Sequence, residues 1–433
     1  MVHSYFKRHK DFTPKIDNAP HSDLGISVVL PSYNEPNLWQ SLETLMQCHK
    51  PECAVEVLVV VNYPADSPSD IEQNAQHCIE LVRKADQIFN NKRFKFIPLK
   101  AFNLPKKHAG VGLARKTGMD QAAWRLLGSQ SEMKIIACFD ADATCSKNYL
   151  VEIEKLWKEN PKTEACSIKY EHPVEGNNFE QKIYDGIAQY ELHLRYYMWA
   201  GRYIGHPHSY QTVGSSMACS AEAYLRFGGM NKNKAGEDFY FLQKIIPHGQ
   251  FKELYTTTVY PSPRVSDRVP FGTGRAMTKH LETDSTTYYT YNFESFISLK
   301  YFLEISPLTL FKAKNKDINN LLSSLPTPLR DFLTRNDFAN AINEINANTS
   351  SPKNFNKRFY LWFDAFKMLK YLNFANEQHF DKQPITNEAQ TLARLLGIIT
   401  TDSPVSTKSL LTIYRQLDTA PPPIIFSNYN NCY

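Results

Sequence analysis

Two carboxylates lie one residue apart in ACFDADATC, residues 137–145, directly after a short apolar run. In an extended segment, residues i and i+2 point to the same face, so Asp140 and Asp142 can look into one space. Carboxylates that share a space repel each other. A lysine or arginine, a proton held by one carboxylate, or a divalent metal ion would relieve this repulsion. The pair is therefore a candidate site whose counter-charge must come from elsewhere.

Polar and glycine-rich segments occur at four further places along the chain. They are PSYNE at 31–35, Asn62, HAGVGLARKTGMD at 108–120 and GGMNKNKAGEDFYF at 228–241. Their order along the chain, together with the aspartate pair, is the order that a nucleotide diphosphate site on an α/β sheet requires. The combination is much more specific than any one of these segments.

Apolar runs alternate with helical patterns over the first 160 residues or so. The runs lie at 26–30, 55–61, 94–99 and 135–139, and helical periodicity covers 38–48, 71–89, 110–127 and 149–159. Strands that are apolar on both faces and alternate with helices predict a parallel sheet covered on both sides. We expect Pro31 to end the first strand. Ligands of such sheets bind at the carboxyl ends of the strands, where Asp140 and Asp142 would lie.

The pattern changes in the second half of the chain. A long aromatic helix is predicted over 179–203, a short helix from about residue 237 and a strand over 255–260, followed by helices at 317–322, 336–345, 356–372 and 387–396. In the helix at 356–372, a buried stripe is predicted for Phe359, Trp362, Phe363, Phe366 and Leu369. We therefore divide the chain into an N-terminal extension (1–24), an α/β domain (25–290) and a mainly helical C-terminal region (291–433).

Composition narrows the class of protein. The formal net charge of +5 is mild and fits phosphorylated or acidic small ligands as readily as a nucleic acid or a membrane surface, so charge alone does not decide the partner. We expect no nucleic acid partner. The eight cysteines lack the spacings of a zinc site or a disulfide scaffold, so we expect reduced thiols and a cytoplasmic protein. No apolar run approaches the roughly 20 residues that cross a bilayer. We expect no membrane span, although peripheral association with a membrane is compatible with the sequence.

Four motifs in order resemble those of the family 2 glycosyltransferases. These are SVVLPSYNEP, GVGLARKTG, DAD and GGM followed by AGED, and the resemblance covers about residues 25–245. It implies a GT-A fold, a Rossmann-like and mostly parallel sheet flanked by helices, with a donor half (25–145) and an acceptor half (146–290). It also implies a hexosyltransferase-like enzyme that moves a sugar from a nucleotide-diphospho-sugar, UDP-sugar being favoured, to an acceptor hydroxyl.

The resemblance also implies the residues that bind the nucleotide-sugar. They are Pro31, Tyr33, Glu35, Asn62, Lys107, Arg115, Asp140, Arg268 and Arg275. Asn62 departs from the family pattern, in which the second strand usually ends on aspartate. An amide can still hydrogen-bond a pyrimidine, and a turn former that closes the strand is the alternative. Arg268 and Arg275 lie in a glycine-containing basic segment, residues 262–280, which could cover the donor diphosphate.

The same resemblance implies a metal site with Mn²⁺ or Mg²⁺ at Asp142, with Asp140 beside it and His280 as a further ligand. A hard cation suits carboxylate and phosphate oxygens and neutralises the charge of a departing nucleoside diphosphate. The alternative is a structural pair between the carboxylates and a nearby cation, and the candidates are Lys106, Lys107 and Arg115.

In the GGM and AGED segment, the resemblance makes Asp238 the base that deprotonates the acceptor, with Glu237 in a supporting role and inversion at the anomeric carbon. Carboxylates at a helix start can also be caps. His206 and Ser215, in an aromatic-rich segment, are the predicted acceptor contacts, and ordinary packing of that segment is the alternative. A glycan, a lipid-linked molecule or a small molecule could be the acceptor.

Two other functions remain open at this stage. A nucleotidyltransferase would use a similar sheet and similar carboxylates, but it usually needs a glycine-rich basic loop after the first strand, where this chain has SYNEPN. A catalytically silent sugar- or nucleotide-binding module is the other, although the three aspartates Asp140, Asp142 and Asp238 argue against it. Because the chain lacks both the Gln-x-x-Arg-Trp motif and membrane-spanning runs, we expect non-processive transfer.

Overall fold

The computed structural model describes residues 3–264, 278 and 287–419. The chain forms two compact units: residues 1–184 and 212–281 make up the first, and residues 185–211 and 282–433 make up the second. Asp140, Asp142, Glu237 and Asp238 all lie in the first unit.

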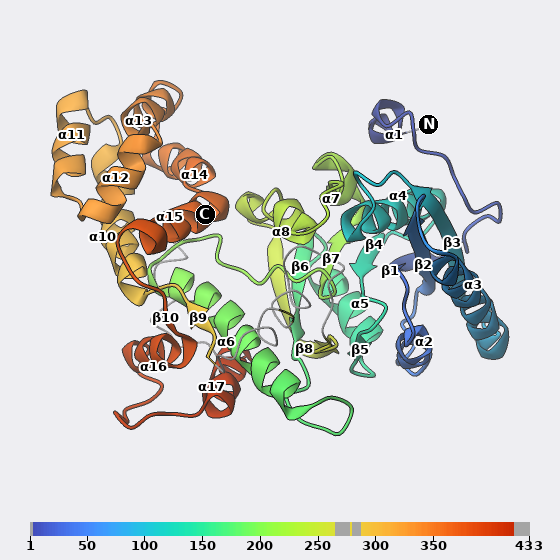
Figure 1. Cartoon of the computed structure of the whole chain (residues 1–433). Coiled ribbons are helices and arrows are strands. Elements are labelled where there is room, and N and C mark those ends of the chain that lie inside the picture. The colour runs from blue at the N-terminus through green and yellow to red at the C-terminus, as the bar shows by residue number, and fades with distance from the viewer. Residues whose placement is uncertain (1–2, 265–277, 279–286, 420–433) are drawn as a thin grey trace. The chain divides into compact units, whose positions relative to one another are not determined.

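The first unit is built on an eight-stranded mixed sheet with the order β3-β2-β1-β4-β7-β6-β8-β5 (Figure 1). The strands are β1 (Leu24–Ser32), β2 (Ala54–Pro64), β3 (Phe94–Leu104), β4 (Ile135–Cys138), β5 (Thr144–Cys145), β6 (Ala165–Tyr170), β7 (Met217–Ser220) and β8 (Phe251–Tyr260). Strands β1 to β4 pair in parallel, as predicted, whereas β7 runs antiparallel to both of its neighbours. With the helices around it, this sheet confirms the predicted α/β fold class.

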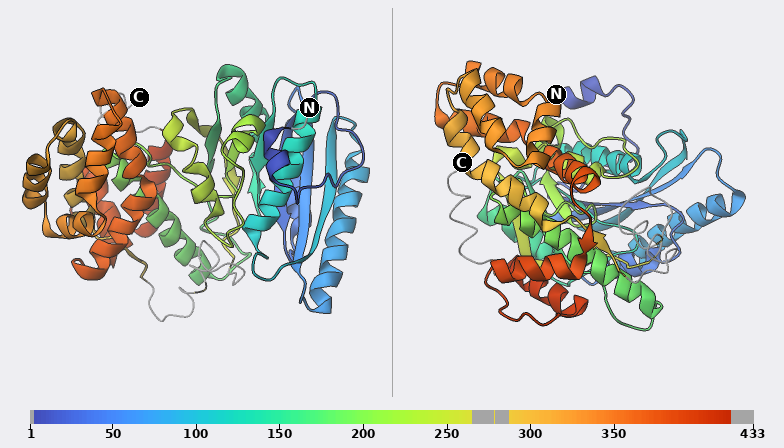
Figure 2. Two further views of the ribbon diagram at one scale, coloured as in Figure 1. Left: turned by 90° about the horizontal axis from the view of Figure 1, so that it is seen from above. Right: turned by 60° about the vertical axis from the view of Figure 1, so that its left-hand side comes forward.

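Helices cover both faces of the parallel half of the sheet. On one face, α2 (Leu38–Met46), α3 (Ser69–Phe89) and α5 (Tyr149–Glu159) form a single core cluster with the side chains of Val28 and Val57. On the other face lies α4 (Val111–Gly128), where a Cβ added to Gly118 would come within 2.4 Å of Val29. Side chains alternate along a strand, so Val28 and Val29 mark opposite faces. Figures 1 and 2 show α3 and α4 on these two sides.

The first strand runs past Pro31, so the prediction that this proline ends the strand is wrong. Strand β1 continues to Ser32, and Pro31 pairs opposite Val60 of β2. On the other side of β1, the pairing with β4 reaches only Val29. Pro31 therefore has a neighbouring strand on one side only. Because proline has no backbone N–H, it is tolerated at such a position, where no hydrogen bond to a second strand is lost.

The N-terminal segment is anchored to the first unit through helix α1 (Ser4–Arg8). The buried Tyr5 hydroxyl donates to Asp120 Oδ1 at 2.7 Å and accepts from Lys116 Nζ at 2.7 Å. Tyr224 of α7 (Ala221–Arg226) donates to the same aspartate oxygen at 2.6 Å. These bonds tie α1 and α7 to α4, the helix that also carries Arg115.

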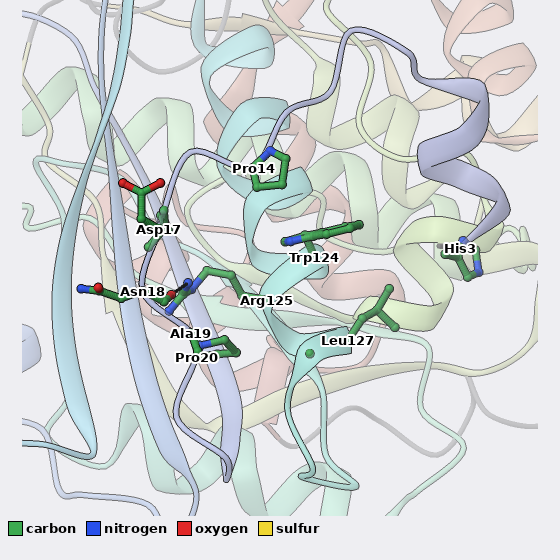
Figure 3. Close-up of a pocket in the computed structure, with 11 residues that line it drawn as sticks. His3, Pro14, Asp17, Asn18, Ala19, Pro20, Trp124, Arg125 and Leu127 are labelled. Atoms are coloured by element: carbon green, nitrogen blue, oxygen red, sulfur yellow. Dashed lines mark hydrogen bonds between the residues drawn. The ribbon is translucent and has the colours of Figure 1, made fainter. Parts of the chain in front are cut away.

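A cavity of about 580 Å³ lies between the N-terminal segment and the end of α4 (Figure 3). Pro14, Trp124 and Leu127 line it, and beside it Arg125 is occupied by other protein groups. The Arg125 guanidinium donates to both carboxylate oxygens of Glu56 at 2.6 Å and to the carbonyl oxygen of Asn18 at 2.7 Å. The C-terminus of α4 faces the amino ends of the strands, so this cavity lies at the edge opposite to Asp140.

Removing Arg125 should destabilise the first unit strongly. The Arg125 and Glu56 side chains are 5% and 4% exposed, and breaking a buried pair leaves an uncompensated charge. We expect Arg125→Ala to lower the free energy of unfolding by about 3–5 kcal/mol in urea titrations. The exposed Arg93–Asp23 pair is the control, and Arg93→Ala should cost about 0–1 kcal/mol. Equal effects of the two substitutions would contradict this expectation.

The second unit is helical, apart from a two-residue antiparallel pairing of β9 (Tyr289–Thr290) with β10 (Gln383–Pro384). Its helices are α6 (Gln181–Tyr203, which begins in the first unit), α10 (Phe293–Leu310), α11 (Asn315–Ser324), α12 (Thr327–Arg335), α13 (Phe338–Ala347), α14 (Pro352–Trp362), α15 (Ala365–Gln378), α16 (Ile385–Leu395) and α17 (Thr407–Thr419). The predicted helical C-terminal region is confirmed. In the described part of the chain, none of the helices combines the length and the apolar character needed to cross a membrane.

The single helix predicted over 356–372 is in fact two helices. Helix α14 ends at Trp362, and α15 begins at Ala365 behind the N-cap Asp364, whose carboxylate accepts from the Lys367 backbone N–H at 2.7 Å. The predicted stripe is correspondingly interrupted: Phe359 and Phe363 are fully buried, whereas Phe366 is only partly buried. The aromatic residues continue at helical spacing across the break, so periodicity alone did not show that Asp364 caps a new helix.

Candidate active site

The aspartate pair lies at the carboxyl end of β4, as predicted from the sequence. Past the last residue of β4, the Phe139 N–H donates to the Val29 carbonyl at 3.0 Å, so the backbone stays beside β1 up to the pair. The Ser41 hydroxyl of α2 then lies 2.8 Å from the Ala141 carbonyl oxygen and 2.7 Å from that of Ala143. The loop that carries both aspartates is therefore held between a central strand and a buried helix.

Arg115 of α4 joins the aspartate pair to the GGM and AGED segment. Its guanidinium donates to Asp140 Oδ1 at 2.6 Å and forms a closer contact with Glu237 Oε1. The Arg115 side chain is only 2% exposed, and burial opposes its charge, but Glu237 and Asp140 outweigh burial and raise its pKa. A Cβ added to Gly214 would come within 2.8 Å of this guanidinium, so glycine is needed there for close approach. Of the cations proposed as structural partners, Arg115 is the one that pairs with Asp140.

Glu237 and Asp238 differ in their surroundings. Glu237 is buried against Arg115, whereas Asp238 is partly exposed, with Oδ1 2.7 Å from the Phe239 backbone nitrogen. Burial raises the pKa of both carboxyl groups, that of Glu237 to about 7, and Arg115 opposes the shift in each case. A buried, paired Glu237 suits a positioning role, and a more exposed Asp238 can reach a substrate.

Neither carboxylate is a helix N-cap. The N-cap of α8 (Glu237–Leu242) is Gly236 at φ 68°, a left-handed conformation that suits glycine, and this residue has no side chain to form a cap bond. Glu237 and Asp238 are the first two residues of the helix. Neither carboxylate therefore occupies the N-cap position. Asp238 nevertheless accepts a hydrogen bond from the Phe239 backbone N–H of the first turn, where negative charge is favourable, so the capping alternative remains open for Asp238.

The loop before α8 packs directly on the start of α4. A Cβ added to Gly112 would lie 2.0 Å from the Asn233 carbonyl oxygen, and one added to Gly110 would lie 3.3 Å from Lys234 Cα. Because the first of these atoms is backbone, a side chain at residue 112 would displace the loop. The two glycines of the GVGLARKTG region thus allow α4 to set the position of α8 and its carboxylates.

Arg264 belongs to the basic segment 262–280, but the sequence did not predict which carboxylates it pairs with. It follows β8, and its guanidinium binds both carboxylate oxygens of Glu35, with Nη1 2.8 Å from Oε1. The same guanidinium lies 2.8 Å from Asp142 Oδ2. Burial opposes the charge of Arg264, but Glu35 and Asp142 outweigh it and raise the pKa of this residue. This pairing was not predicted because 229 residues separate Arg264 from Glu35, and no local pattern reports such a contact.

Asp140 and Asp142, at the carboxyl end of β4, could bind a divalent cation together with the phosphates of a ligand. Within the described residues, no group of three or more His, Cys, Asp and Glu side chains could hold a metal ion. Mg²⁺ is commonly bound by one or two carboxylates together with substrate phosphates, and Asp140 and Asp142 are 37% and 24% exposed at the side chain. These two residues therefore fit a cation shared with a diphosphate.

The other predicted nucleotide contacts lie in different environments. Pro31 is buried within β1, Tyr33 is partly buried in the loop that follows, and Lys107 is exposed in the turn before α4. The buried Asn62 amide donates to the Ser32 carbonyl at 3.0 Å, so this side chain helps to hold the end of β1. Arg268, Arg275 and His280 lie outside the described residues.

The two predicted acceptor contacts lie in different units. Ser215, in the first unit, is buried with its hydroxyl 3.3 Å from that of Ser216. His206, in the second unit, is fully buried with Nε2 3.1 Å from the Phe363 carbonyl oxygen, and burial lowers its pKa to about 4. Their acceptor role remains a prediction.

The raised pKa of Glu237 predicts a pH dependence of stability. Between its ordinary value of 4.5 and about 7, the folded state binds this proton more than the unfolded state does, so the contribution of Glu237 to the free energy of unfolding falls as pH rises. In urea titrations, the parent should lose stability relative to Glu237→Gln across this window. The exposed Glu222, in the first turn of α7, is the control, and the difference between parent and Glu222→Gln should stay flat. A Glu237→Gln difference that is constant or reversed with pH would contradict the burial effect.

Comparison with protein families gives one match within this chain. Residues 27–212 match the model described as "Glycosyl transferase family 2". The chain carries a glycosyl transferase family 2 domain. The family and the enzyme class expected from the four motifs are thereby confirmed. The domain match includes Glu35, Arg115 and the aspartate pair, whereas Glu237 and Asp238 lie beyond its end.

Comparison with solved structures finds S. aureus TarS. A crystal structure of TarS 1–349 in complex with UDP-GlcNAc matches with a TM-score of 0.39 and 15% identity, covering 78% of this chain and 92% of that one. The same fragment in complex with UDP matches with a TM-score of 0.38 and 16% identity. A longer TarS chain matches with a TM-score of 0.36 and 14% identity, and there the match spans 55% of its length. The search of curated proteins returned no match.

Proposed function

We propose that this chain transfers a sugar from a UDP-sugar to an acceptor hydroxyl and depends on Mn²⁺ or Mg²⁺. The transfer inverts the configuration at the anomeric carbon and is non-processive. The observation that carries this proposal is the arrangement around Arg115. A single buried guanidinium bridges Asp140, at the end of β4, and Glu237, at the start of α8. This bridge links the aspartate pair, inside the family 2 match, to the helix that carries the predicted base, Asp238, which lies beyond that match.

The residues divide into a donor side and an acceptor side. Glu35 and Tyr33, in the loop after β1, are proposed to contact the nucleoside, and Asp140 and Asp142 to face the diphosphate. When bound, the cation would supply positive charge to the phosphate oxygens, and Asp142 would hold it with Asp140 beside it. Electrostatic stabilisation of the leaving diphosphate is the largest contribution expected from this side.

On the acceptor side, Asp238 takes the proton of the acceptor hydroxyl as its oxygen attacks the anomeric carbon. The bond between that carbon and the phosphate oxygen breaks, and its electron pair leaves with the nucleoside diphosphate. Attack from the opposite face gives inversion. Glu237 and Arg115 keep the start of α8 in place, so the carboxylate of Asp238 is oriented before the substrate arrives.

Donor identity is the first experimental question. Melting temperatures and donor consumption should be measured for UDP-, GDP-, CMP- and dTDP-sugars, each with Mn²⁺ and with EDTA. We expect UDP-sugars to raise the melting temperature in Mn²⁺, and to be consumed in Mn²⁺ but not in EDTA. Preference for another base would overturn the UDP assignment alone. If no nucleotide-sugar bound or reacted under either condition, the proposed function would be wrong.

A further inference from the structure

Arg115 and Arg264 divide the carboxylates of the strand edge between them. Arg115 holds Asp140 and Glu237, whereas Arg264 holds Glu35 and Asp142. Each arginine therefore compensates two negative charges. In the described structure, the charge beside Asp142 is a guanidinium of the chain itself.

The two arginines differ in how readily they could leave their partners. The Arg115 side chain is 2% exposed and comes from the second turn of α4, where it lies against the backbone of Gly214. The Arg264 side chain is 18% exposed and belongs to a segment that follows β8 outside any helix or strand. Arg264 is therefore the more accessible of the two arginines.

Asp142 is also the residue to which the proposed function assigns the metal. A guanidinium nitrogen 2.8 Å from Asp142 Oδ2 occupies the approach to that oxygen and neutralises its charge. A divalent cation that binds Asp142 must displace Arg264, and breaking this charge-assisted hydrogen bond reduces the affinity for the cation. A diphosphate arriving with the cation would offer the displaced guanidinium a new anionic partner.

We propose that Arg264 is a resident counter-cation that competes with the divalent metal for Asp142, so that metal binds strongly only together with the nucleoside diphosphate. This inference rests on the proposed function, because it assumes that Asp142 is the metal carboxylate. Its consequence is ordered occupancy: the free chain does not hold Mn²⁺ tightly, and UDP and Mn²⁺ strengthen each other's binding. By linkage, each ligand raises the affinity of the other by the same factor.

The test is an Mn²⁺ titration of the full chain, in which the electron paramagnetic resonance signal of free Mn²⁺ reports binding. Parent and Arg264→Gln are titrated with and without UDP. We expect weak binding to the parent without UDP, and tighter binding to Arg264→Gln by about 5- to 150-fold, the usual range of such couplings. With UDP present, the difference between parent and variant should shrink.

Two further variants serve as controls. One tests the loss of a positive charge elsewhere, and the other tests the effect of Glu35 once Arg264 is replaced. Arg226→Gln removes one positive charge from the partly exposed Arg226–Glu164 pair and should leave Mn²⁺ affinity unchanged. The double variant Arg264→Gln/Glu35→Gln also removes the buried carboxylate that Arg264 neutralises, and with it an alternative metal ligand. The gain in Mn²⁺ affinity should persist there, because Asp142 is the group that the arginine releases.

The outcomes separate the inference from the function beneath it. If Mn²⁺ binds in the presence of UDP, but Arg264→Gln and the double variant show parental affinity without UDP, Arg264 does not compete and the inference is wrong. A gain lost in the double variant would assign the metal to Glu35 and also overturn it. If Mn²⁺ binds neither to the parent nor to the variants, even with UDP present, the proposed metal-dependent function is wrong and this inference is wrong with it.

Discussion

Asp238→Asn is expected to bind UDP and Mn²⁺ like the parent and to transfer sugar about 10²- to 10⁴-fold more slowly. The reason is that an amide is nearly isosteric but cannot take the acceptor proton. Asp238 is partly exposed at the start of α8, while Arg115 contacts its neighbour Glu237 directly. Donor binding and chemistry should therefore separate in single-turnover kinetics.

The matched control lies in another short helix. Glu222 is an exposed carboxylate in the first turn of α7, as Asp238 is in the first turn of α8. Glu222→Gln should keep the parental transfer rate. Glu237→Gln should be milder than Asp238→Asn, because we propose that Glu237 positions the start of α8 and does not itself take the acceptor proton. Near-parental transfer by a folded Asp238→Asn variant would remove Asp238 from the catalytic residues.

Asp142→Ala is expected to abolish turnover and to remove the Mn²⁺-dependent stabilisation by UDP, and Asp142→Asn should be nearly as damaging. The diphosphate and this carboxylate are proposed to meet mainly through the cation, so neither substitution leaves a substitute ligand. The fold should survive, because Arg264 keeps its bidentate contact with Glu35.

Calorimetric titration with UDP checks this expectation. Asp23→Ala removes a carboxylate from an exposed ion pair just before β1, at the opposite edge of the sheet, and should leave both UDP affinity and turnover unchanged. If Asp142→Ala bound UDP as tightly as the parent and without regard to Mn²⁺, the metal role of Asp142 would be disproved.

The parallel half of the sheet could be predicted because its strands are short apolar runs and its helices have clear periodicity. Once β4 was placed, the position of the aspartate pair followed from the rule that parallel strands end at one edge. The motif order then predicted the family, because the polar segments follow successive strands and helices. Each of these inferences depends only on residues that are close together in the sequence.

Contacts between distant segments were beyond such reasoning. Strand β7 is four residues long and lies antiparallel between β4 and β6, where nothing local reports the pairing. Arg264 reaches Glu35 across 229 residues, and Arg115 reaches Glu237 across 122. The motifs therefore selected the candidate carboxylates, but they did not predict that two arginines pair with them in the structure.

A crystal structure of the full chain with UDP and Mn²⁺ tests the central claim most directly. It should show the uridine beside Tyr33 and Glu35, and the diphosphate and Mn²⁺ beside Asp142, with Arg264 withdrawn from that carboxylate. UDP bound instead in the cavity of Figure 3, or Mn²⁺ held away from Asp142, would contradict the assignment of this strand edge as the site of sugar transfer.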